Sequence, residues 1–146
     1  MFTFATDYYI LVFVATIGVI QVAASFGRLN GLLFIKSPIV TRVLGIALAA
    51  AAFIWFFSTG DRNINDYEGG LDAPTQSLFF FFGSSTGFVF TFVVSTLVNA
   101  RMNGGEAPPE EGLDALRDTN YVRALAHSIS YWRREWRTRM KKYFSG

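Results

Sequence analysis

The part of the chain that comes closest to a metal-binding pattern is the polar segment 60–72, GDRNINDYEGGLD. Asp61, Asn63, Asn65 and Asp72 fall at positions 1, 3, 5 and 12 of a calcium loop counted from Asp61. Carboxylate and amide oxygens at this spacing suit a hard cation. The spacing therefore makes these four residues a candidate for a weak cation site.

The same segment departs from the calcium pattern in ways that favour another interpretation. Position 6 is Asp66, where the sharp turn of a calcium loop requires Gly, and Arg62 lies inside the expected ligand shell. Asn, Asp and Gly are also the residues of ordinary turns, and Asp72 followed by Pro74 is a typical helix start. We therefore expect a structured turn outside the membrane that presents a docking surface to a partner.

Reactive side chains are scarce in the rest of the sequence. There is no Cys, so disulfides, thiolate metal sites and thiol nucleophiles are excluded. The single His, His127, lies between Arg123 and Arg133, and we expect a surface residue instead of a metal or pigment ligand. The middle of each apolar segment carries no ionisable group, whereas ion and proton pathways usually need one at mid-depth. We expect neither an enzyme nor a resident metal or cofactor.

Three long apolar segments dominate the sequence. Hydrophobic residues make up 51% of the chain and aromatic residues 17%, and they come in blocks. About 20 apolar residues in a helix cross the hydrocarbon core of a bilayer. The blocks predict transmembrane helices at about 8–26, 38–58 and 75–99, within a three-span domain over residues 1–100. The expected fold class is an all-α membrane protein with three transmembrane helices plus a cytoplasmic amphipathic helix.

The distribution of charge predicts how the chain lies in the membrane. Arg28, Lys36 and Arg42 flank the first loop, and Arg101 and the other basic residues of the tail follow the third span. The second loop holds Arg62 among several acids. By the positive-inside rule, the N-terminus and the acidic loop lie outside, and the first loop and the tail lie in the cytoplasm. We expect a multi-pass protein of the cytoplasmic (inner) membrane.

Small residues recur every four positions along one side of the third span, where they share a helix face and form a smooth strip. The strip consists of Gly83, Gly87, Thr91 and Ser95. The second span carries a similar strip at Gly45 and Ala49. Two interpretations stay open: the second and third spans pack against each other, or one of the strips docks a partner subunit.

The tail begins with a linker over 101–112, which is rich in Gly, Pro and Glu and has little to bury. From 113 to 144, apolar residues recur every three or four positions, which predicts an amphipathic cytoplasmic helix of about 30 residues. We expect protein contact from the stripe between Leu116 and Ile129, and contact with anionic lipid from the basic half that follows. The expected lipid contacts are Trp132, Arg133, Arg134, Trp136, Arg137, Lys141 and Lys142.

These features predict a small membrane protein without catalytic residues. The hypothesis that we favour is a non-catalytic accessory or structural subunit of a larger membrane complex, such as an energy-converting one (respiratory or photosynthetic). Its partners would be other membrane subunits and anionic lipids, and not nucleic acid, because the basic cluster is short. Two alternatives stay open. The predicted topology resembles that of some phage holins, which form pores, and a free-standing sensor or scaffold would use the acidic loop to read an external signal.

Overall fold

Three long helices form the body of the molecule. The computed structural model describes residues 4–59, 71–100 and 112–144, with the side chains of 112, 113, 127, 134, 135 and 138–144 excepted. The helices are α1 (Phe4–Phe26), α2 (Pro38–Ser58) and α3 (Ala73–Val98). Each is long and apolar enough to cross a membrane, which confirms the prediction of three helices of this kind. Even α2, with 21 residues, extends for about 31 Å, the thickness of a hydrocarbon core.

The ends of these helices follow from local sequence. Ser37 precedes Pro38 at the start of α2, and Asp72 precedes α3 with its early Pro74. Proline suits the first turn because its fixed φ is helical and its missing N–H would have no partner there. At the end of α1, Arg28 takes a positive φ of 54°, and the Leu29 N–H bonds back to the Ala24 carbonyl at 3.0 Å. This left-handed termination turns the chain into the first loop.

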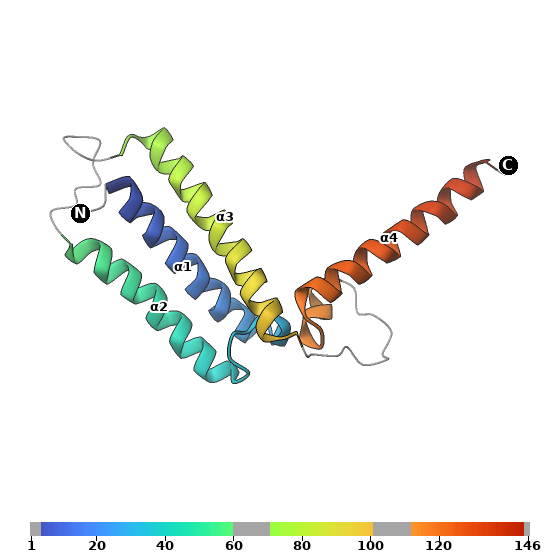
Figure 1. Cartoon of the computed structure of the whole chain (residues 1–146), viewed down its shortest axis with the longest axis horizontal. Coiled ribbons are helices and arrows are strands. Elements are labelled where there is room, and N and C mark those ends of the chain that lie inside the picture. The colour runs from blue at the N-terminus through green and yellow to red at the C-terminus, as the bar shows by residue number, and fades with distance from the viewer. Residues whose placement is uncertain (1–3, 60–70, 101–111, 145–146) are drawn as a thin grey trace.

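α1 lies between α2 and α3, and both outer helices pack against it (Figure 1). The expectation that the second and third spans pack against each other is therefore wrong. The strips predicted on α2 and α3 both face α1 instead, because α1 offers a Gly to one neighbour and short β-branched side chains to the other. The three helices form an open arrangement in which α1 is the hub.

The tail is not one continuous helix. A short 3-10 helix η2 (Gly112–Arg117) is followed by a break and then by α4 (Tyr121–Phe144). Asn120 begins α4, because its Oδ1 accepts a hydrogen bond from the Arg123 N–H at 3.0 Å, as an N-cap residue does. The two segments, residues 112–144, are called the arm below. α4 runs away from the three-helix body and across the direction of its helices (Figure 1).

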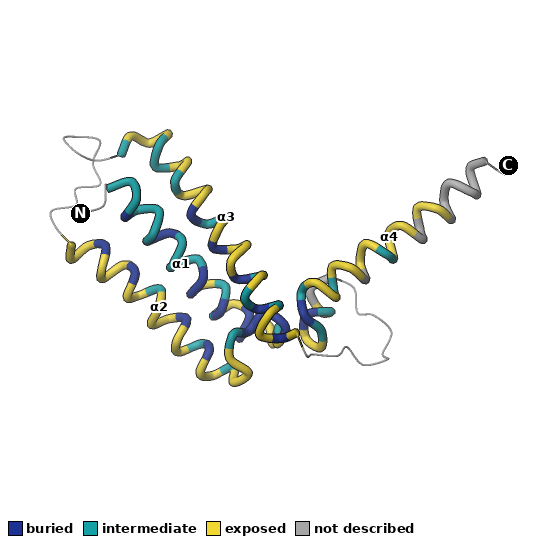
Figure 2. Tube along the Cα trace, viewed as in Figure 1, coloured by how far each residue is buried: buried dark blue, intermediate teal, exposed yellow. Residues whose placement is uncertain are grey.

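The buried core is small and follows α1 (Figure 2). Towards the start of α1, Leu11 packs with Ala52 and Phe56 of α2. At the other end, a second cluster joins α1, the first loop and the arm through Ala24, Leu32, Leu33 and Leu116. Leu116 is only 3% exposed, so it serves the chain's own core and is not the start of a stripe for a partner. The outward sides of α2 and α3 remain largely exposed (Figure 2).

Candidate functional site

The contact between α1 and α2 is a close approach of two backbones. A Cβ atom at Gly18 would lie 2.6 Å from the Gly45 carbonyl oxygen and 3.0 Å from the Ala49 backbone nitrogen. Conversely, a Cβ at Gly45 would lie 2.8 Å from the Gly18 carbonyl oxygen. Only glycine allows the helices to come this close. The predicted strip residues Gly45 and Ala49 therefore face α1, and Gly18 is the partner that the sequence analysis did not identify.

The contact between α1 and α3 is somewhat looser. Cβ atoms at Gly83 and Gly87 would lie 3.0 Å from the Cβ atoms of Val12 and Thr16, respectively. Further along the same strip, Thr91 and Ser95 are fully buried, and their hydroxyls donate to carbonyls of their own helix. All four predicted strip residues of α3 thus lie on its buried face. This face is used within the chain, so docking of a partner has to use other surfaces.

Buried amide side chains gather where the bundle meets the first loop. The Gln21 Nε2 donates to the Leu32 carbonyl at 3.0 Å, and the Phe34 N–H donates to the Gln21 Oε1 at 3.0 Å. Gln21 is 4% exposed and thereby satisfies two backbone groups of the loop from inside a membrane-spanning helix. Such groups would cost free energy if they were left unpaired in a buried place.

Asn99, directly after α3, holds the same loop from the other side. Its Nδ2 lies within hydrogen-bonding distance of three carbonyl oxygens, those of Gly31 (3.2 Å), Leu33 (2.9 Å) and Ser95 (2.9 Å). An amide has two N–H donors, so these three contacts share them. Asn99 is 4% exposed. Together, Gln21 and Asn99 tie the first loop to α1 and α3.

Two further asparagines fasten the arm to the first loop and to the end of α3. The Asn120 Nδ2 donates to the Asn99 carbonyl at 3.4 Å, and the Asn30 Nδ2 donates to the Arg117 carbonyl at 3.2 Å. Gly31 lies so close to the arm that a Cβ there would be 2.0 Å from the Thr119 carbonyl oxygen. We call the four amide residues Gln21, Asn30, Asn99 and Asn120 the polar junction.

An aromatic contact completes the root of the arm. The rings of Phe92 in α3 and Tyr121 in α4 stack in parallel with their centroids 4.3 Å apart. Both side chains pack against the cluster that contains Leu116. The start of the arm is therefore held by apolar packing, ring stacking and buried hydrogen bonds at once.

The chemistry available at the polar junction is that of binding and positioning. Amide side chains donate and accept hydrogen bonds but are neither acids nor bases near neutral pH, and here their bonds go to backbone groups. The junction couples α1, α3, the first loop and the arm into one unit. None of these four residues belongs to a motif that the sequence shows by itself.

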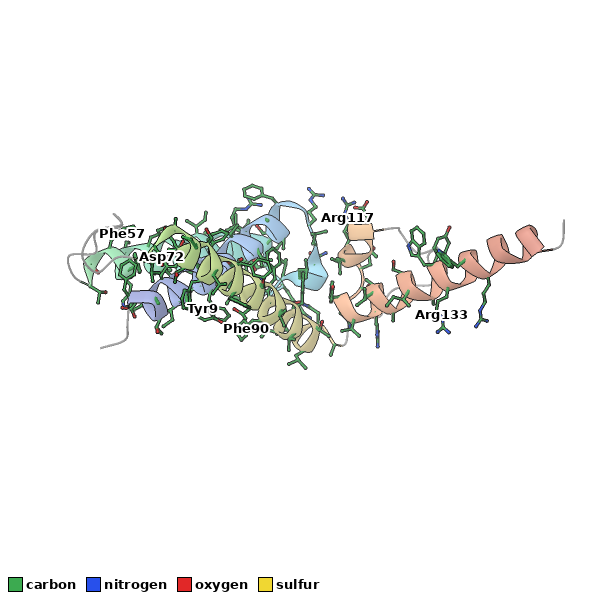
Figure 3. The ribbon with its side chains drawn as sticks, turned by 90° about the horizontal axis from the view of Figure 1, so that it is seen from above. Tyr9, Phe57, Asp72, Phe90, Arg117 and Arg133 are labelled. Atoms are coloured by element: carbon green, nitrogen blue, oxygen red, sulfur yellow. The ribbon has the colours of Figure 1, made fainter. Side chains whose placement is uncertain are left out.

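The acidic segment is only partly visible. Asp61, Asn63 and Asn65 lie outside the described residues, and the weak cation site and the docking turn stay predictions there. Asp72 is exposed and precedes α3, and its carbonyl accepts the Gln76 N–H at 2.9 Å. Figure 3 shows Asp72 and Phe57 at the end of the bundle that is opposite to the arm. Among the described residues, no cluster of His, Asp or Glu has the make-up of a metal site.

The side chains predicted to contact lipid are those of α4. Trp132, Arg133, Trp136 and Arg137 are exposed, whereas the side chains of Arg134, Lys141 and Lys142 lie outside the described set. Figure 3 places Arg117 at the root of the arm and Arg133 well along α4. Arg117 forms an ion pair with Asp114 at 3.0 Å within η2.

Comparison of the chain with protein-family models, with curated proteins and with solved structures gives no match.

Proposed function

We propose that this chain is a non-catalytic accessory or structural subunit of a larger membrane protein complex. The observation that carries the proposal is the open arrangement of the three spans. α2 and α3 use their glycine strips on α1, which leaves their opposite sides without a partner in the described chain. On α2 that side is strongly apolar, with Ile54 68% and Val43 61% exposed.

The outward side of α2 also contains small residues that suit a protein neighbour. Ala47, Ala50 and Ala51 are exposed and point away from the face that Gly45 presents to α1. Ala47 and Ala51 are four residues apart, the spacing that lets a second membrane helix approach closely. Lipid chains gain little from such a flat surface, whereas a packed helix gains van der Waals contact along it. We call Val43, Ala47, Ala50, Ala51 and Ile54 the outer α2 face.

We further propose that the end of the bundle that carries the arm lies in the cytoplasm. Arg28, Lys36 and Arg42 belong to the first loop or its borders, which contact the root of the arm. Their positive charge supports a cytoplasmic position. An alkaline phosphatase fused after Gly146 should then be inactive, and an active fusion would contradict this orientation.

Purification of the chain from its native membrane in a mild detergent tests the proposed function. We expect the chain to elute together with other membrane proteins. The ratio of the chain to these proteins should be constant across the peak and unaffected by moderate salt. Elution as a ring or cluster of identical copies would favour the pore-forming alternative. Elution as a monomer would contradict the proposal.

A further inference from the structure

The geometry points to α4 as a helix that lies on the surface of an anionic bilayer, with its apolar stripe in the membrane and its arginines at the lipid phosphates. The apolar stripe consists of Val122, Leu125, Ile129, Trp132 and Trp136. This inference concerns what covers the exposed apolar stripe of α4, and it does not depend on the proposed function.

The depth at which α4 leaves the bundle is the first argument. α3 has 26 residues and is about 39 Å long, more than a hydrocarbon core of about 30 Å. Tyr121, the first residue of α4, stacks on Phe92, which lies six residues, or about 9 Å, before the end of α3. The root of the arm also packs, through Leu116, on Leu32 and Leu33 of the first loop, which lie between the basic residues Arg28 and Lys36. Because basic residues that flank a span lie at the headgroups, the start of α4 is close to the boundary between the acyl chains and the headgroups.

The direction of α4 is the second argument. α4 does not continue the direction of α1, α2 and α3 but runs across it (Figure 1). A helix that starts at the boundary and runs across the spans follows the plane of the membrane. The stacked rings, the buried Leu116 and the hydrogen bond from Asn120 to Asn99 hold the start of α4 at this place.

The face of α4 is the third argument. Residues of the apolar stripe are spaced by three or four positions and therefore share one side of the helix. They are well exposed, with Val122 at 54%, Ile129 at 52% and Trp136 at 65%. Trp side chains are favoured at the membrane boundary, where an apolar ring and a polar N–H meet their preferred surroundings. Burial of this stripe in the acyl region is the ordinary mode of an interfacial helix.

The charge of α4 identifies the lipid as anionic. Its sequence has one acid, Glu135, against seven basic residues: Arg123, Arg133, Arg134, Arg137, Arg139, Lys141 and Lys142. Arg133 and Arg137 directly follow the two Trp residues of the stripe, and both are exposed. Long basic side chains beside an apolar stripe can reach outward to phosphate groups while their stems stay with the stripe.

The full chain, reconstituted into phosphatidylcholine vesicles with and without phosphatidylglycerol, tests the inference. Because the chain has no Cys, single substitutions Ile129→Cys and Tyr131→Cys allow one nitroxide label at each site. The two positions are about 200° apart on the helix. With phosphatidylglycerol present, we expect the label at 129 to be shielded from a water-soluble nickel chelate and to be accessible to oxygen. The label at 131 should remain accessible to the chelate.

A second pair of variants tests the role of charge. Arg133→Gln together with Arg137→Gln should lower the ratio of bound to free α4 about 30-fold, because each basic residue near an anionic surface contributes about fivefold. Salt should weaken binding in the same direction. Arg117→Gln, which removes a charge outside α4, is the matched control and should change the ratio little.

Three results would overturn the inference. The label at 129 could stay open to the chelate in vesicles that contain phosphatidylglycerol. It could be shielded equally in pure phosphatidylcholine without any effect of salt or of the arginine variants. It could also be shielded only as the number of chains per vesicle rises, which would assign the stripe to a second copy of the chain.

Discussion

Replacement of Gly31 by Ala should detach the arm from the three-helix body. The new Cβ would lie 2.0 Å from the Thr119 carbonyl oxygen and 3.0 Å from that of Leu116. Both obstacles are backbone atoms, which cannot turn aside as the end of a side chain can. Overpacking of this kind costs roughly 1–3 kcal/mol or more. Detachment of the arm removes this clash at the lowest cost in free energy, because the arm contacts the body only around its root.

Nitroxide pairs in the cysteine-free chain provide the measurement. With labels at Lys36→Cys in the first loop and Ser128→Cys in α4, the distance distribution should be narrow in the parent and broad in the Gly31→Ala variant. Gly27→Ala is a matched control in the same loop, because its Cβ would first meet the flexible Leu29 side chain at 3.3 Å. A narrow, unchanged distribution for Gly31→Ala would show that the arm is not held as described.

Asn99→Ala should also detach the arm and broaden the distance distribution, through the loss of hydrogen bonds. It removes the donor that serves the Gly31 and Leu33 carbonyls and leaves buried acceptors unpaired. Each unpaired buried group costs about 1–3 kcal/mol. Ser84→Ala removes a hydroxyl that bonds only to its own helix and should leave the distribution narrow.

The second large effect is expected at the centre of the bundle. Gly18→Ile should push α1 and α2 apart, because even its Cβ would lie 2.6 Å from the Gly45 carbonyl oxygen. Gly87→Ile should be less harmful, since its Cβ would lie no closer than 3.0 Å to atoms of Thr16. A loss of about 3 kcal/mol or more for Gly18→Ile, and less for Gly87→Ile, follows from the difference in overpacking.

The midpoint of unfolding, as SDS is titrated into mild detergent micelles, ranks these variants. Ala47→Ile, on the outer α2 face, is the control for added bulk and should have the same midpoint as the unsubstituted chain. Gly87→Ile should unfold earlier, and Gly18→Ile earliest. Equal midpoints for Gly18→Ile and Ala47→Ile would contradict the central position of α1.

The spans were predictable because lipid requires long apolar blocks, which composition alone reveals. Their packing was not. The four-residue strip from Gly83 to Ser95 identified the buried face of α3 but not the helix it meets. Gly18 could not be predicted as a packing residue, because the residues four positions before and after it are Val14 and Val22 and no small-residue repeat includes it.

The polar junction could not be predicted from the sequence, for a different reason. Gln21, Asn99 and Asn120 are far apart in sequence, and each is ordinary by itself until the fold brings them to one loop. The break before α4 did leave a signal. Asp118, Thr119 and Asn120 are residues that begin helices, yet the periodic apolar pattern on both sides led to one helix over 113–144.

The proposal that the chain serves a larger complex is tested most directly by photocrosslinking in the native membrane. A benzophenone amino acid would replace Val43 or Ile54 on the outer α2 face, and Phe56, which is 1% exposed, would be the buried control. We expect positions 43 and 54 to crosslink to one and the same membrane protein, which is not a copy of this chain, and position 56 to give no such crosslink. Adducts with lipid alone, or with a second copy of this chain, would contradict it.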